Sequence, residues 1–298
     1  MLKKRNVNEK SFLYLLLVNI ILYTVFFSLF IFVKHFSPDD YNTYWNQDIV
    51  ALDVLARSYR NCYGLLLAVL DRIHVNVVAD QIFFGCILIL SFAWCTTVIT
   101  KEVNRRINKD HDIRILFLVQ IGSLLLLSNV FISEWLWFSL GYLQWMISVI
   151  TMTYGAVALA KKDHFGKNWL IGFLCLLIAA GSYQTILSYY VFLVMFFIFV
   201  DEKGAVSKES AAAVLRAAAA AVLSIVVNML FTYALKAAGI ISMETRMDFG
   251  WERLGERLRL TADLQKEIWV KGMGLLPEYS AIFVLCILSG ILIVTIYH

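Results

Sequence analysis

Charged residues and prolines are scarce in this chain, and their scarcity limits the classes of protein to which it can belong. Charged residues make up only 16% of the 298 positions and hydrophobic residues 60%, whereas a soluble domain of this size carries about 25% charged residues. The only two prolines, Pro38 and Pro277, lie outside the long apolar runs. The composition therefore excludes an ordinary soluble domain and predicts an integral membrane protein.

Metal-binding and redox motifs are missing as well. The five cysteines are scattered without a CxxC pair, and the five histidines show no HExxH or similar ligand spacing. We therefore expect no metal site and no cofactor. The net charge of +4 is explained by the Lys and Arg that membrane proteins carry in cytoplasmic loops, so we expect no nucleic-acid partner.

Long apolar runs are what the chain has instead. A spanning helix needs about 20 apolar residues. The run at 168–200 is too long for one ordinary span, and its polar break "GSYQT" at 181–185 divides it into two short ones, because glycine and hydrogen-bonding side chains weaken a helix interior. We expect an all-α polytopic fold of about eight transmembrane helices in a single domain, 1–298. The other predicted spans are 12–33, 78–100, 113–132, 136–160, 211–238 and 280–298.

The distribution of Lys and Arg predicts the orientation of these spans. The N-terminal segment "MLKKRNVNEK" precedes an apolar run that is too long for the core of a cleaved signal peptide, so we expect an uncleaved anchor. If the N-terminus is cytoplasmic, the short inner loops are the ones rich in Lys and Arg. This pattern favours a cytoplasmic N-terminus.

Two outer loops, 34–77 and 239–279, carry helical patterns of their own. Apolar residues recur at three- and four-residue spacing from Trp45 to Tyr63 and again from Trp251 to Ile268. Each pattern predicts an amphipathic helix that lies along the membrane interface.

Three polar features fall on the same outer face in this orientation. They are the pair Asp39 and Asp40 in "SPDD", Glu134 in "SEW", and the segment "SYQT" at 182–185. A carboxylate beside the bilayer can act as a general base. Alternatively, the Asp pair forms a solvated turn after Pro38, and Glu134 favours the start of a helix capped by Ser133. The residues alone leave both interpretations open.

Neutral and basic side chains complete the candidate set. Tyr183 and Gln184 can bind sugar hydroxyls, or they can simply cap two short helices. Arg57 and Arg60 on the first outer helix can bind phosphate groups, either those of bilayer lipids or that of a substrate.

Four short segments carry a resemblance to a known family. They are "SPDDYN" after the first span, the helix with Arg57 and Arg60, "FISEWLWF" entering the fourth span, and "GSYQTILSYY". In their order and shared face they resemble the bacterial membrane glucosyltransferases of the Gtr type, which modify O-antigen and related surface polysaccharides. That family lies within the polytopic glycosyltransferases called GT-C. The resemblance extends over residues 11–200.

The resemblance implies a GT-C-like architecture and a reaction. The donor would be a polyprenyl-phosphate-linked sugar, undecaprenyl-phosphate glucose, and the acceptor a surface polysaccharide or glycolipid. The site would face outward from the bacterial cytoplasmic (inner) membrane, with a flippase and a donor synthase as partners. A monophosphate donor needs no metal. Carried onto this chain, the catalytic candidates are Asp39, Asp40 and Glu134, and the substrate-binding candidates are Arg57, Arg60, Tyr183 and Gln184.

The sequence leaves other functions open, and it leaves open whether the chain is part of a longer protein. A transporter or flippase of lipid-linked saccharides predicts ionisable residues inside the spans, and the predicted spans hold almost none. A polymerase or ligase of lipid-linked oligosaccharides would share the outer face and the basic residues, and a structural membrane subunit is a further alternative. Because the sequence stops at His298 within the last predicted span, and Gtr-type members are commonly longer, we expect either an unusually short protein or one truncated at the C-terminus.

Overall fold

The computed structural model contains two compact units, residues 1–246 and 247–298, which are described separately. All regular structure in the described part of the chain is helical, which agrees with the expected all-α fold. The described residues are 2–107, 113–128, 136–161, 166–200, 207–241 and 254–271, together with Tyr279 and Cys286.

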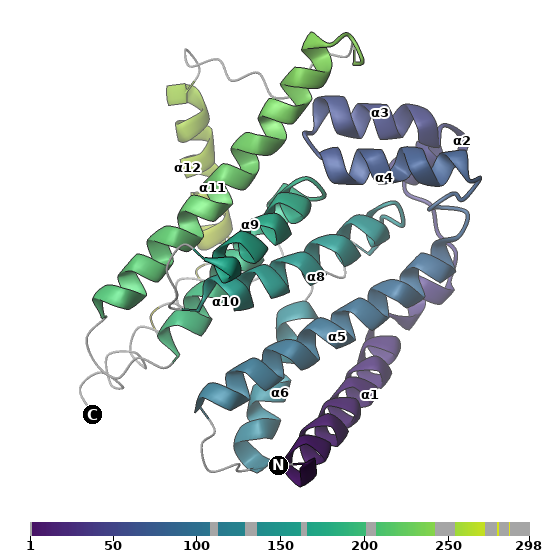
Figure 1. Cartoon of the computed structure of the whole chain (residues 1–298). Helices are drawn as coiled ribbons and strands as arrows, with labels where there is room; N and C mark the ends of the chain where they lie inside the picture. The colour runs from purple at the N-terminus through teal and green to yellow at the C-terminus, as the bar shows by residue number, and fades with distance from the viewer. Residues whose placement is uncertain are drawn as a thin grey trace. The chain divides into compact units, whose positions relative to one another are not determined.

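Apolar helices make up most of the first unit (Figure 1). Four of them are long and apolar enough to cross a membrane, so the protein is an all-α membrane protein. They are α1 (Leu2–Phe32, apolar from Phe12), α5 (Gln81–Ile107), α8 (Gly141–Leu159) and α11 (Lys208–Ala237). Three shorter apolar helices accompany them: α6 (Ile113–Leu127), α9 (Lys167–Ala180) and α10 (Leu187–Phe199).

The number of membrane crossings remains a prediction. A span needs a rise of about 30 Å, or roughly 20 residues, and α6, α9 and α10 have 15, 14 and 13. The predicted last span, 280–298, lies outside the described residues apart from Cys286.

The predicted division of the run at 168–200 is confirmed. Helix α9 ends at Ala180, a 3₁₀ turn covers Gln184–Ile186, and α10 begins at Leu187. Gly181 ends α9 where the chain passes close to its neighbours: a Cβ there would lie 2.6 Å from Asn228 Oδ1 and 2.9 Å from Cys62 Sγ. A larger residue at this position would have to displace the side-chain ends of Cys62 on α4 and Asn228 on α11.

The segment 34–77 forms three helices rather than the single helix predicted from Trp45 to Tyr63. They are α2 (Pro38–Trp45), α3 (Gln47–Arg57) and α4 (Asn61–Arg72). The pattern of apolar spacing did not reveal two interruptions. Asn46 ends α2 with non-helical dihedral angles, and Tyr59 adopts a positive φ of 54° between α3 and α4, a conformation that no helix interior allows.

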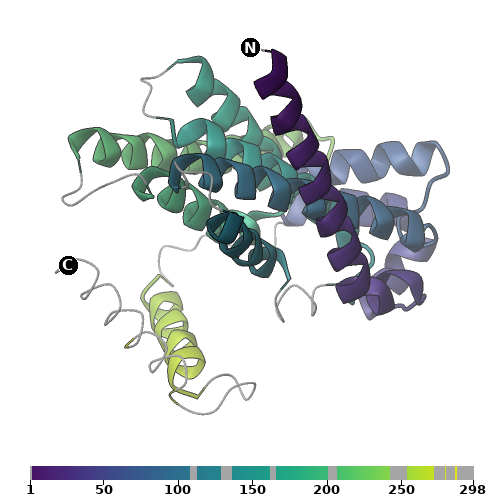
Figure 2. The same cartoon turned by 90° about the horizontal axis from the view of Figure 1, so that it is seen from below.

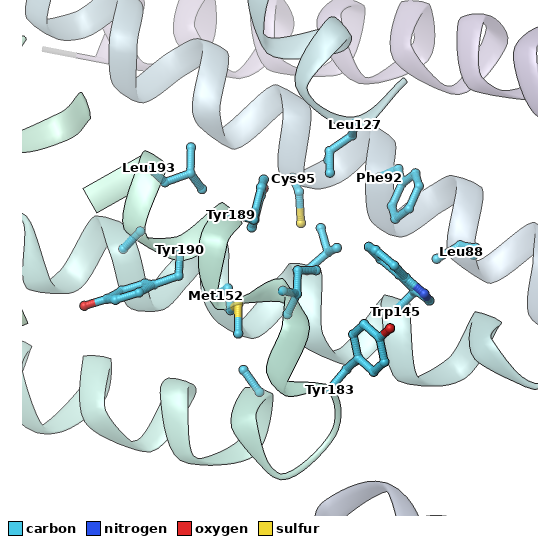
Figure 3. Packing of buried hydrophobic residues seen from close by; sticks show 14 of the residues in the cluster. Leu88, Phe92, Cys95, Leu127, Trp145, Met152, Tyr183, Tyr189, Tyr190 and Leu193 are labelled. Atoms are coloured by element: carbon cyan, nitrogen blue, oxygen red, sulfur yellow. The ribbon is translucent and has the colours of Figure 1, made fainter. Parts of the chain in front are cut away.

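These three helices lie together at one end of the long helices (Figures 1 and 2). Helix α3 packs along α4, and α2 contacts α3. The apolar core lies between the long helices, where α8 packs against α5 and α9 and α5 packs against α1. Figure 3 shows side chains of α5, α6, α8 and α10 that meet in this core.

A buried polar network joins α1, α5 and α6 inside the bundle. Asn19 donates to Thr97 Oγ1 at 2.9 Å, Thr100 donates to Gln120 Oε1 at 2.9 Å, and the Gln120 amide donates to Asn19 Oδ1. A buried polar group is costly unless it is hydrogen-bonded. Because the amides and hydroxyls in this network bond to one another, the three helices can bury them together.

The second unit contains α12 (Leu254–Lys271). This helix overlaps the second predicted amphipathic pattern, Trp251 to Ile268, and extends past it to Lys271; Leu258 and Leu264 on it are exposed. The helix is therefore present, while its placement along the membrane interface remains a prediction.

Candidate active site

A cavity of about 850 Å³ opens in the first unit, where α2 and α3 meet the start of α8 and the segment before the 3₁₀ turn at Gln184–Ile186. Helices α2 and α3 supply one wall, and α8 with the 181–184 segment supplies another. The polar lining residues are Asp39, Asn42, Thr43, Asp53, Arg57, Ser58, Arg60, Gln144 and Tyr183, and the remaining ones are Ile49, Val50, Val54, Phe138, Leu140 and Gly141.

Helix α2 places Asp39 in the cavity. The helix starts in a capping box, in which the Ser37 hydroxyl accepts from the Asp40 amide and Asp40 accepts from the Ser37 amide, with Pro38 in the first turn. Asp39 and Asn42 are three residues apart and lie on one helix face. Both are exposed and both line the cavity.

Asp40 has very different surroundings from its neighbour. Its side chain is fully buried, and its carboxylate accepts hydrogen bonds from the Ser37 amide at 2.9 Å, the Leu140 amide at 2.8 Å and the Ser139 amide at 3.3 Å. Two of these donors belong to the residues that lead into α8. Asp40 therefore connects α2 to the start of α8, and its oxygens are occupied by backbone donors.

Helix α3 contributes an ion pair to the wall. Arg57 Nε lies 3.1 Å from Asp53 Oδ1, and the two side chains are 42% and 23% exposed. The pair has the four-residue spacing that brings side chains together on one helix face. Its positive and negative charges largely cancel.

Arg60 lies against the opposite wall. Its guanidinium is 4.6 Å from the centre of the Tyr183 ring, a cation–π distance, and its Nη1 donates to Gln144 Oε1 at 3.4 Å. Tyr183 in turn packs against Trp145, with ring centres 5.5 Å apart, and Figure 3 shows these two rings side by side at the edge of the core. An arginine set on an aromatic ring can bind a phosphate with its remaining N–H groups.

Gln184 contacts the backbone rather than the cavity. Its Nε2 donates to the carbonyl oxygens of Ser58 at 2.9 Å and Tyr59 at 3.1 Å. In the same region the Tyr63 amide donates to the Gly181 carbonyl at 3.1 Å. The segment that carries Tyr183 is therefore bonded on both sides to the segment that carries Arg60.

Tyr63 connects α4 to the start of α8. Its hydroxyl donates to the Leu140 carbonyl at 2.5 Å, and the side chain is fully buried. Burial raises the pKa of the Tyr63 phenol well above its ordinary value. The phenol therefore remains a neutral hydrogen-bond donor.

The structure brings together residues that are far apart in the sequence. Of the predicted candidates, Asp39, Arg57, Arg60 and Tyr183 line one cavity. The functional groups of Asp40 and Gln184 bond to backbone atoms beside it. Glu134 lies outside the described residues.

The sequence analysis missed Asn42, Asp53 and Gln144 as cavity residues. A signal existed for two of them. Asp53 precedes Arg57 by four residues, the spacing of a helical ion pair, and Gln144 is a polar residue in an apolar run. Asn42 has no comparable signal, because nothing in the sequence shows which face of α2 meets the cavity.

This arrangement has the parts that a group transfer needs. Asp39 can accept a proton and Arg60 can stabilise a developing anion, while the Tyr183 ring holds the Arg60 guanidinium in place. Among the described residues, no group of three His, Cys, Asp or Glu side chains could bind a metal ion.

Comparison with known proteins points to one family. The family model described as "Glucosyl transferase GtrII" matches residues 63–250 of the chain, the segment that includes Gln144 and Tyr183. No curated protein and no solved structure matches the chain.

Proposed function

Because the chain belongs to the glucosyl transferase GtrII family, we propose that it transfers glucose from a polyprenyl-phosphate donor to a polysaccharide or glycolipid of the cell envelope. The observation that carries this proposal is the cavity, in which Asp39 and Arg60 line the same space at one end of the apolar helices. A lipid-linked donor suits this position, because its chain can stay among apolar helices while its head group enters a polar cavity.

In the proposed reaction Asp39 is the general base. Its carboxylate accepts the proton of the acceptor hydroxyl while the hydroxyl oxygen attacks the anomeric carbon of the donor sugar. The bond between that carbon and the phosphate oxygen breaks, and the polyprenyl phosphate leaves with the electron pair. Asp39 suits this role better than Asp40, because Asp39 is exposed in the cavity whereas Asp40 accepts three backbone hydrogen bonds.

Arg60 is the proposed ligand of the donor phosphate. Arg60 lines the cavity, and its guanidinium lies between the Tyr183 ring and Gln144, where its planar N–H groups suit a phosphate. A guanidinium aimed at the leaving phosphate stabilises the charge that develops as the bond breaks. Glu134 stays a further catalytic candidate from the sequence.

The proposed location is the bacterial cytoplasmic membrane, with the N-terminus inside and the cavity on the outer face. The Lys and Arg of the short loops support this orientation. A GT-C-like architecture, a donor synthase and a donor-lipid flippase belong to the same proposal, since the donor would have to reach the outer face.

Label transfer tests the proposal. Membranes containing the chain are given radiolabelled undecaprenyl-phosphate glucose and envelope polysaccharide, and wild type is compared with Asp39→Asn. We expect the variant to lose transfer by about 100-fold or more, the lower range for removal of a general base, with unchanged membrane content. Asp48→Asn is the matched control, since Asp48 is an exposed carboxylate of α3 that does not line the cavity.

Two results would contradict this assignment. Full transfer by Asp39→Asn would exclude Asp39 as the base. Absence of transfer by folded wild-type protein would exclude undecaprenyl-phosphate glucose as the donor for this acceptor.

A further inference from the structure

The cavity has two sides that differ in exposure. Gln144 and Tyr183, which contact Arg60, are 6% and 2% exposed. On the α2–α3 side the base of this wall is buried at Thr43 and Val50, but the polar residues Asp39 and Asn42 are exposed and the Arg57 side chain is 42% exposed. The α2–α3 side is therefore the mouth, where a ligand from outside first meets the protein.

The α2–α3 side also carries an ion pair. At the mouth, Asp53 and Arg57 form an ion pair whose charges largely cancel. Such a pair attracts a phosphate weakly, but it presents both hydrogen-bond acceptors and donors. An arginine has five N–H donors in a fixed plane, and the ion pair uses Arg57 Nε. A neutral ligand with many hydroxyls suits this chemistry better than an anion does.

The proposed base lies on the same side. Asp39 and Asn42 line the cavity one helical turn apart on α2, and α2 contacts α3. A general base must lie within hydrogen-bond reach of the hydroxyl that it deprotonates. The acceptor sugar must therefore bind next to α2, where Asn42 and the ion pair on α3 are the neighbouring polar groups.

We propose that Asn42, Asp53 and Arg57 form an acceptor subsite that binds the hydroxyls of a saccharide at the mouth of the cavity. Arg60, Tyr183 and Gln144 then serve the donor on the buried side. In this subsite the Asp53 carboxylate accepts from sugar hydroxyls, and the Arg57 guanidinium and the Asn42 amide donate to them. The inference rests on the proposed function, because Asp39 as base is what places the acceptor beside α2.

A simpler account of the ion pair makes a different prediction. Partly exposed pairs at four-residue spacing contribute little to stability, so Asp53 and Arg57 could be no more than a surface pair. In that case, removing either charge would leave saccharide binding unchanged. The two accounts are separated by measuring saccharide and donor-lipid binding independently.

The experiment uses the purified full chain in detergent. Binding of fluorescent envelope polysaccharide and binding of undecaprenyl-phosphate glucose are titrated separately for wild type, Asp53→Asn and Arg57→Gln. We expect each variant to weaken polysaccharide binding by about tenfold or more, the loss for a hydrogen bond to a charged group, and to change donor binding by less than about twofold. Asp48→Asn on the same helix is the control and should change neither. Arg60→Lys should show the opposite pattern.

The outcomes separate the subsite from the reaction. The subsite is overturned if the Asp53→Asn and Arg57→Gln variants bind polysaccharide as tightly as wild type. It is also overturned if wild type does not bind polysaccharide. A weaker affinity of the Asp53→Asn variant for the donor lipid also overturns the subsite, because Asp53 would then contribute to donor binding. If polysaccharide binding depends on both residues while wild type transfers no label, the saccharide subsite stands and the proposed transfer function fails.

Discussion

At the scale of single residues, Asp39 and Asp40 are the most instructive pair. They are adjacent in the chain, yet Asp39 is exposed in the cavity while Asp40 is fully buried and accepts three backbone hydrogen bonds. The proposal therefore divides the two carboxylates, with Asp39 as base and Asp40 as the structural link between α2 and α8. The same division applies to Tyr183 and Gln184, of which only Tyr183 lines the cavity.

We predict different effects of the two Asp→Asn substitutions on stability. Asparagine at position 40 keeps one acceptor oxygen, but its NH₂ group would face backbone N–H groups that now donate to the second carboxylate oxygen. Each buried donor left without an acceptor costs about 1–3 kcal/mol. Asp40→Asn should therefore lower the thermal unfolding temperature of the purified protein by several degrees. Asp39→Asn, in the exposed position, should leave that temperature unchanged. An Asp40→Asn protein as stable as wild type but inactive would reassign the base to Asp40.

At the scale of elements, the junction between α3 and α4 positions the buried side of the cavity. Tyr59 has a positive φ there, which disfavours a residue with a side chain. Gln184 donates to the carbonyls on either side of that strained position, and Arg60 follows directly. The break between α9 and α10 therefore supports the turn that orients Arg60 over Tyr183.

We predict that Gln184 acts through Arg60, which a double-mutant cycle can test. Gln184→Ala should lower kcat/KM for the donor by about tenfold, or about 1.4 kcal/mol, by letting the 58–60 turn relax. In the Arg60→Lys background, Gln184→Ala should lower kcat/KM for the donor by less than about threefold. Transfer of label at varied donor concentration measures all four proteins. Equal losses in both backgrounds would instead mean that Gln184 acts independently of Arg60.

At the scale of the whole molecule, the cavity depends on segments that the family match covers only in part. The match runs from residue 63 to 250 and so includes α8 and the 181–184 segment. Helices α2 and α3, with Asp39, Asp53 and Arg57, precede it. Both parts belong to the same compact unit, so the candidate site combines a wall inside the matched region with a wall outside it.

The proposed orientation predicts the accessibility of the two ends of α8. Asp40 connects α2 to the start of this helix, and Lys161 follows its end. The 19 residues of α8 rise by about 28 Å, close to the thickness of the bilayer core. With the native cysteines replaced, Asp48→Cys should react with a membrane-impermeant maleimide in intact cells. Lys161→Cys should react only in inverted vesicles, and the reverse pattern would place the cavity inside.

The sequence by itself determined the membrane class, the all-helical fold and the break at 181–185. These follow from local properties, because apolar run length, glycine and polar interruptions act within a few turns of the chain. Only the tertiary structure decided that 45–63 is divided at Asn46 and Tyr59, and that Asp53 and Gln144 line the cavity with Asp39. It also separated Asp39 from Asp40, because two of the three amides that bond to Asp40 belong to residues about 100 positions away in the chain, and no local pattern predicts a partner at that distance.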